Sequence, residues 1–133
     1  MEKIYVNRDI RKMLIELAAG NKTITYGKLN TSSDSGYDFQ DPEERELFAD
    51  DIRDISQNEV NHGRPPLGSV VVYKSGSVTK EILESLFEMC QELYDLNPEA
   101  TKPTNKFLKD MQLKCHEFWK DKENVRQFGE RRR

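Results

Sequence analysis

A chain of 133 residues has the size of one domain and is too short for two, because independent domains cluster at about 100–150 residues. Charged residues make up 34% and hydrophobic residues 35% of the chain, which is enough apolar material for one core. No apolar run approaches the roughly 20 residues of a membrane-spanning helix, and residues 1–12 lack the continuous apolar segment of a signal peptide, so we expect a cytoplasmic protein.

The net charge of −3 combines three regions of different sign. Residues 1–40 hold six basic and five acidic residues, residues 41–100 hold five and fourteen, and residues 101–133 hold ten and five. The three regional charges are therefore +1, −9 and +5. An acidic middle and a basic end indicate partners of opposite charge. The alternative interpretation is that the two regions neutralise each other within one small domain.

The first predicted helix spans residues 8–19. Asn7 is its expected N-cap, its apolar residues follow the i, i+3, i+4, i+7 rule, and Gly20 stands where a left-handed C-cap is expected. Residues 3–6 before it form either a short strand or a leader packed on the core. The segment 23–29 favours a short helix, with a strand as the alternative, and residues 30–40 have the composition of a loop.

Asp41-Pro42-Glu43-Glu44 is the strongest helix start in the sequence. Asp41 is the N-cap, Pro42 occupies the first helical position, and Glu44 at N3 predicts a capping box. This helix should end near Asn61, where a glycine and two prolines follow. Its predicted apolar face consists of Leu47, Phe48, Ile52, Ile55 and Val60.

Residues 67–73 predict the one clear strand, because three consecutive valines and a tyrosine are bounded by turn residues. Its partner is either residues 4–6 or residues 23–25. Thr79 is the expected cap of a helix that stops near Asn97-Pro98, and Thr104 is the expected cap of a helix that frays toward Val125 and Phe128. We expect these two helices to form an antiparallel hairpin. The predicted fold is therefore α+β and mainly α, with four to five helices and a two- to three-stranded sheet in a single domain, residues 1–133.

Two short phrases resemble known proteins. Ile24-Thr25-Tyr26-Gly27-Lys28-Leu29, after an apolar helix, resembles the opening of winged-helix domains, among them the alkyltransferase-like DNA-binding proteins. His62-Gly63-Arg64-Pro65-Pro66-Leu67 is similar to a phrase in small bacterial proteins of uncharacterised function. Over residues 7–73 the resemblance implies a winged-helix-like topology, in which helix 41–61 takes the place of a recognition helix and strand 67–73 begins the wing.

The resemblance also implies a division of the chain and a limit on its activity. We expect a winged-helix-like part at residues 1–77, a helical hairpin at 78–128 and a flexible basic tail at 129–133. The chain lacks the Pro-Cys-His-Arg phrase that carries alkyl transfer, so the resemblance implies no such activity.

Acidic residues dominate the helix at 41–61. Between Asp41 and Glu59 there are eight acidic residues against Arg45 and Arg53, and DNA phosphates would repel such a face. We therefore expect a non-enzymatic interaction module, such as an inhibitor or immunity factor, that binds a basic protein such as a nuclease-type toxin. A solvated helix exterior is the alternative interpretation. The candidate partner-binding residues are Glu43, Glu46, Asp50, Asp51 and Asp54.

The alternative function is a winged-helix-like nucleic-acid-binding regulator that uses the basic C-terminal region. Lysines and an arginine would contact phosphates there, and a tryptophan would stack on a base. The candidate residues for this alternative are Lys106, Lys109, Lys114, Trp119 and Arg126.

Catalytic and metal-binding patterns are few. Cys90 and Cys115 lie in helical apolar stripes without a Cys-x-x-Cys spacing, so we expect buried thiols, no metal and no cofactor. His62 near Glu59 is a candidate general base, but a histidine at this position more often caps the end of a helix, where Arg64 would also bond the last carbonyls. We therefore do not expect an enzyme.

Overall fold

The computed structural model describes residue 4 and residues 6–130. In these residues the chain is mainly helical with a small parallel sheet, which confirms the predicted class, although there are six α-helices rather than four to five. None of the described helices is both long and apolar enough to cross a membrane. The elements are α1 (Arg8–Ala19), β1 (Ile24–Thr25), α2 (Tyr26–Ser32), α3 (Pro42–Asn61), the 3₁₀ helix η1 (Leu67–Val70), β2 (Val71–Val72), α4 (Lys80–Cys90), α5 (Asn105–Lys120) and α6 (Lys122–Phe128).

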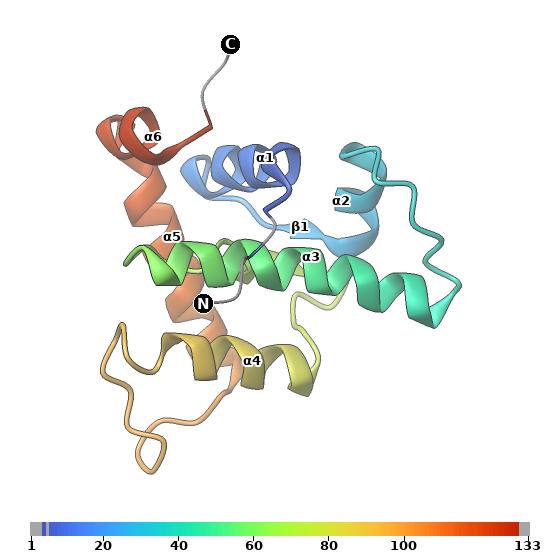
Figure 1. The fold of residues 1–133 in the computed structure, drawn as a ribbon. Helices are drawn as coiled ribbons and strands as arrows, with labels where there is room; N and C mark the ends of the chain where they lie inside the picture. The colour runs from blue at the N-terminus through green and yellow to red at the C-terminus, as the bar shows by residue number, and fades with distance from the viewer. Residues whose placement is uncertain (1–3, 5, 131–133) are drawn as a thin grey trace.

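The long helix α3 organises the molecule (Figure 1). It crosses the middle of the view, with α1, β1 and α2 on one side and α4 on the other. The helix α5 runs steeply behind α3 and leads into α6.

The first helix has the predicted bounds but a different C-terminal cap. Asn7 accepts the backbone N–H of Ile10 at 3.1 Å, as expected of an N-cap. Gly20, however, has φ −86°, and its N–H still bonds the carbonyl of Glu16. The left-handed residue is Asn21, with φ 58°, because asparagine tolerates this conformation better than most residues.

The segment 23–29 combines both predicted alternatives. Ile24 and Thr25 form β1, and Thr25 then caps α2 by accepting the N–H of Lys28 at 3.2 Å. β1 pairs in parallel with β2, with Ile24 opposite Val71. The alternative strand at residues 3–6 includes residues 3 and 5, which lie outside the described part of the chain.

The predicted strand at 67–73 is largely wrong. Only Val71 and Val72 are extended, and the four residues before them form η1. The carbonyl of Pro66 accepts both the N–H and the hydroxyl of Ser69, at 3.1 and 2.8 Å, which curls the backbone. When every residue of a short apolar segment is buried, the sequence shows neither the alternation of a strand nor the periodicity of a helix, so the two cannot be distinguished.

The helix α3 has the predicted bounds but lacks the predicted capping box. Asp41 accepts the N–H of Glu43 at 3.0 Å. The carboxylate of Glu44 accepts the N–H of Asp38 at 3.1 Å instead of that of Asp41, because the preceding loop folds back over the helix start. Leu47, predicted to face the core, is 53% exposed.

The C-terminal helices are shorter and more broken than predicted. Thr79 caps α4 as expected, but α4 ends at Cys90, and Thr104 makes no side-chain bond at the start of α5. The backbone of Asp121 is extended and its side chain accepts the N–H of Glu123 at 2.9 Å, which ends α5 and starts α6.

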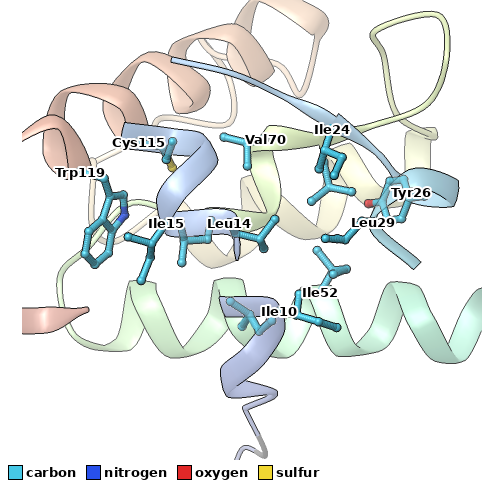
Figure 2. Close-up of a cluster of buried hydrophobic side chains, with 14 of the residues drawn as sticks. Ile10, Leu14, Ile15, Ile24, Tyr26, Leu29, Ile52, Val70, Cys115 and Trp119 are labelled. Carbon is cyan, nitrogen blue, oxygen red and sulfur yellow. The ribbon is translucent and has the colours of Figure 1, made fainter. Parts of the chain in front are cut away.

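The core consists of two apolar clusters that α5 connects. The first is formed by α1, β1, α2, α3, η1, Val71 of β2 and the second half of α5, and it includes Leu14, Ile52 and Trp119 (Figure 2). The second is formed by β2, α4 and the first half of α5, where the rings of Phe87 and Phe107 meet edge to face at 5.4 Å. Because α5 belongs to both, the two clusters are parts of one folded unit.

Candidate functional site

The five predicted partner-binding residues lie on two sides of α3. Glu46 and Asp50 border a groove between α3 and α4. Glu43 is exposed in the first turn, and Asp54 lies beside Arg53, with an O–N distance of 3.9 Å. Asp51 points away from this groove, toward Tyr37 in the loop between α2 and α3.

The carboxylate of Asp51 is used inside the molecule. It accepts the phenolic O–H of Tyr37 at 2.9 Å. This hydrogen bond, together with partial burial and the carboxylate charge, raises the pKa of Tyr37. Asp51 therefore anchors the loop to α3 and is the weakest of the five candidates for binding a partner.

The α3–α4 groove is the site that the structure adds to the predicted residues. It has a volume of about 490 Å³, and Tyr26, Ile52, Ile82, Leu86 and Met89 are among its apolar lining residues. The exposed ring of Tyr73 stacks on the ring of Tyr26, with centroids 4.9 Å apart. Arginines and carboxylates share the rim, which consists of Arg45, Glu46, Asp50, Arg53 and Glu81.

Electrostatic interactions along the rim are local. Arg53 lies 3.7 Å from Asp50 and 3.9 Å from Asp54. Partial burial raises the pKa of Asp54, the charge of Arg53 lowers it, and the charges of Asp50 and Asp51 raise it further, with a net increase. The carboxylates of Asp50, Asp51 and Asp54 are thus close enough to influence one another.

Leu47 adds an apolar residue to the acidic face of α3. It lies one helical turn from Glu43 and Asp50, and its side chain is one of the few large hydrophobic ones that are exposed. Sequence reasoning assigned it to the core because it continues the helical apolar pattern. In the structure the neighbouring Phe48 is buried in the core and Leu47 is not.

The residues predicted for nucleic-acid binding do not form one surface patch with an accessible aromatic ring. Lys106, Lys109 and Lys114 are exposed on α5. Trp119 is 0% exposed, so the prediction that it stacks on a base is wrong, because its ring fills the first cluster. Arg126 is bonded to Glu123 within α6.

A buried ionic cluster occupies the C-terminal end of α3. Glu59 is 0% exposed and accepts hydrogen bonds from Arg11 at 2.9 and 3.1 Å and from Arg64 at 2.9 Å. Burial alone would raise the pKa of Glu59, but the hydrogen bonds and charges of the two arginines outweigh it and lower the pKa. Sequence reasoning missed this cluster, because Arg11 is 48 residues away and looks like a surface residue of α1.

Among the described residues, the ring of His62 makes no hydrogen bond to the Glu59 carboxylate. The Nδ1 atom of His62 lies 2.8 Å from the carbonyl oxygen of Asn58, so the ring caps the end of α3, which was one of the two roles predicted for it. Arg64, which was expected to bond the last carbonyls of the helix, binds the Glu59 carboxylate instead, because that charge is buried and needs a partner.

The two cysteines are buried and free, as predicted. The thiol of Cys115 donates to the carbonyl of Pro66 at 3.1 Å, and burial raises its pKa to about 12. A thiol with so high a pKa is a poor nucleophile near neutral pH. Within residues 4 and 6–130, no three histidine, cysteine, aspartate or glutamate side chains are grouped to hold a metal ion.

No protein-family model, no curated protein and no solved structure matches this chain.

Proposed function

We propose that this chain is a non-enzymatic interaction module that binds a basic segment of a partner protein in the α3–α4 groove. The observation that carries the proposal is an apolar floor whose rim holds three carboxylates, those of Glu46, Asp50 and Glu81, against two arginines. Apolar contacts and exposed aromatic rings supply most of the binding energy in protein interfaces, and charged rims supply orientation and a fast encounter. Tyr73 is the exposed aromatic side chain of the groove that is suited to anchor such a segment.

The partner we favour is a nuclease-type toxin in the bacterial cytoplasm, for which this protein would act as an inhibitor or immunity factor. A nuclease binds a polyanion, so its substrate surface is basic and matches a face rich in carboxylates. Glu46 and Asp50, which border the groove, are the acidic residues that we assign to this contact, whereas Glu43 and Asp54 are not among its lining residues.

We also propose a winged-helix-like first half, at residues 1–77, and a C-terminal helical hairpin at 78–128. The order of α1, β1, α2, α3 and β2 supports the first part, and the shared cluster of α4 and α5 supports the second. One feature departs from a wing formed by two strands. After β2 the chain turns at Tyr73–Ser77 and enters α4, with no further strand among the described residues.

The proposal is tested with a designed basic peptide, an amphipathic helix of leucines and lysines, whose binding is followed by NMR chemical shifts and calorimetry. We expect shifts at Tyr73 and Met89 and binding that weakens with salt. The double variant Glu46→Lys/Asp50→Lys should raise the Kd by about tenfold or more, because two attractions become repulsions.

The matched control is Glu16→Lys/Glu117→Lys, which makes the same change of net charge at exposed positions on α1 and α5. This control should bind the peptide like the wild type. The proposal is contradicted if both double variants lose the same affinity, or if a peptide with glutamates in place of the lysines binds equally well.

The alternative proposal, a nucleic-acid-binding regulator, rests on a lysine-lined hollow at α5. Lys102, Lys106 and Lys114 line a space of about 580 Å³ beside Tyr94, and the amine of Lys114 lies 4.7 Å from the centre of the Tyr94 ring. Tyr94 is therefore the aromatic side chain near these lysines, in place of Trp119. Labelled single-stranded RNA should then bind with an affinity that falls steeply with salt and falls further in Lys106→Gln/Lys114→Gln, whereas an absence of binding at low salt would exclude this alternative.

A further inference from the structure

The segment after α6 is held to the rest of the molecule mainly by arginine contacts. No residue of α6 is buried. Gly129 and Glu130, which follow α6, were predicted to belong to a flexible tail at residues 129–133. The side chain of Glu130 is, however, only 13% exposed, and both of its carboxylate oxygens are bonded. It accepts Arg8 Nε at 2.7 Å and Arg11 Nη1 at 2.9 Å. Residues 131–133 of that predicted tail lie outside the described part of the chain.

The carbonyl of Phe128 and its ring complete this attachment. The carbonyl accepts Arg11 Nη2 at 2.7 Å, and the guanidinium carbon of Arg64 lies 5.4 Å from the ring centre. The ion pair between Glu123 and Arg126 lies within α6 and does not tie the helix to other elements. Apart from these contacts, the Asn124 side chain donates to the carbonyl of Phe118 at 2.8 Å and the rings of Phe118 and Phe128 are 6.0 Å apart.

The arginines here carry more charge than the buried carboxylate can neutralise. Arg8, Arg11 and Arg64 supply three positive charges, and Glu59 neutralises one of them. Glu130 neutralises a second and leaves one unmatched. Without Glu130 the site would carry two unmatched positive charges, and Arg11 Nη1 would lose its acceptor.

The arginines also face a hollow of about 410 Å³. Asn58, His62 and the three arginines line part of it, and α6 and Glu130 line another part. Guanidinium groups arranged around one point bind oxyanions through paired N–H donors, and phosphate is the oxyanion whose double charge matches this excess.

We propose that Arg8, Arg11 and Arg64 form a binding site for a phosphate group, either free or on a phosphorylated ligand, and that Glu130 is a built-in competitor that occupies it. Phosphate binding displaces Glu130 and releases α6, with the extended Asp121 as the hinge. This site lies at the C-terminal end of α3 and does not depend on the groove proposed above.

The test measures binding of inorganic phosphate to the full chain by calorimetry. Glu130→Gln removes the competing charge and keeps the size of the side chain, so it should lower the Kd for phosphate by about tenfold. Arg8→Gln in the Glu130→Gln background should abolish that gain, and Arg8 is suitable because its side chain is 63% exposed and carries no core packing.

The matched control is Glu123→Gln, which removes one acidic charge from the neighbouring helix α6 without touching the three arginines. It should leave the phosphate Kd unchanged. In the wild type, saturating phosphate should also speed hydrogen exchange of the amides of residues 124–129. A phosphoserine peptide tests whether a phosphorylated ligand produces the same change in exchange at a lower concentration.

Three results would overturn the proposal. The first is a Glu130→Gln variant that binds phosphate no more tightly than the wild type. The second is an equal gain in Glu123→Gln, which would indicate a non-specific effect of net charge. The third is exchange in α6 that phosphate leaves unchanged. Thermal unfolding of each variant shows that it remains folded during the measurement.

Discussion

At the scale of single residues, acidic side chains in and around α3 serve two different purposes. Asp41 caps the helix, Asp51 binds Tyr37, and Glu59 binds two arginines. Glu43 and Glu46 remain exposed and form no ion pair or side-chain hydrogen bond with the described residues. The large negative charge of this region is therefore partly structural, and only the remaining part is free to attract a partner.

Glu59 is the residue whose loss we expect to damage the fold most. The variant Glu59→Gln leaves Arg11 and Arg64 buried beside a neutral group, and breaking a buried ion pair in this way lowers the free energy of unfolding by about 3 kcal/mol. Urea unfolding measures this change. Glu46→Gln is the control and should change the free energy by less than about 0.5 kcal/mol, because Glu46 is exposed. Equal effects of the two substitutions would contradict the structural role of Glu59.

Glu130 makes the stability depend on pH. Burial raises its pKa, but hydrogen bonds from Arg8 and Arg11 and their charges lower it below the ordinary value of 4.5. A carboxyl whose pKa is lowered by folding stabilises the fold above its unfolded pKa, and this contribution disappears as the pH falls through the folded pKa. The wild type should therefore be more stable than Glu130→Gln at pH 7, and the difference should shrink as the pH falls below 4.5. A difference in melting temperature that stays constant from pH 7 to pH 3 would contradict this assignment.

At the scale of elements, α3 and η1 approach each other closely at Gly68. A methyl group at this position would collide with the Ser56 hydroxyl and lie 3.0 Å from Ile52 Cγ2. The N–H of Gly68 also donates to Ser56 Oγ at 2.7 Å. We expect Gly68→Ala to lower the free energy of unfolding by about 2 kcal/mol through overpacking, as measured by urea denaturation.

Gly27→Ala is the matched control for that substitution. Gly27 lies in α2, and a methyl group there would meet nothing within 4 Å. Because alanine favours helix over glycine, this variant should be as stable as the wild type or gain up to about 1 kcal/mol. If both alanine variants lose the same stability, the close approach of η1 to α3 is not the cause.

The elements that sequence reasoning predicted well are those with local signals. α1 and α3 carry N-caps and a helical period, and their bounds agree with the structure. The segment 67–70 was misassigned because its conformation depends on the hydrogen bonds of Pro66 and Ser56, which come from packing. Five acidic residues of α3 were predicted to form one face, but they lie on two sides of the helix. The groove residues that η1 and α4 contribute were not predicted. Arg11 and Glu130 were missed because their partners are distant in sequence.

At the scale of the whole molecule, the two candidate sites lie at different parts of α3. The groove lies beside the residues from Arg45 to Ser56, and the arginine site lies beside Asn58 and His62. The two clusters of the core meet at α5, which contributes Cys115 and Trp119 to one and Phe107 and Met111 to the other. Because both clusters need α5 to be folded, the unfolding of one cluster should disrupt the other. We therefore expect the two clusters to unfold cooperatively.

This cooperativity can be measured because Trp119, the single tryptophan, reports on the first cluster only. Leu86→Ala removes a buried side chain from the second cluster, and Leu14→Ala removes one from the first, each at a cost of about 2–5 kcal/mol. We expect both variants to shift the Trp119 fluorescence transition in urea, and the circular dichroism transition to coincide with it. If Leu86→Ala shifted only the circular dichroism signal, α4 and the first half of α5 would unfold as a separate unit.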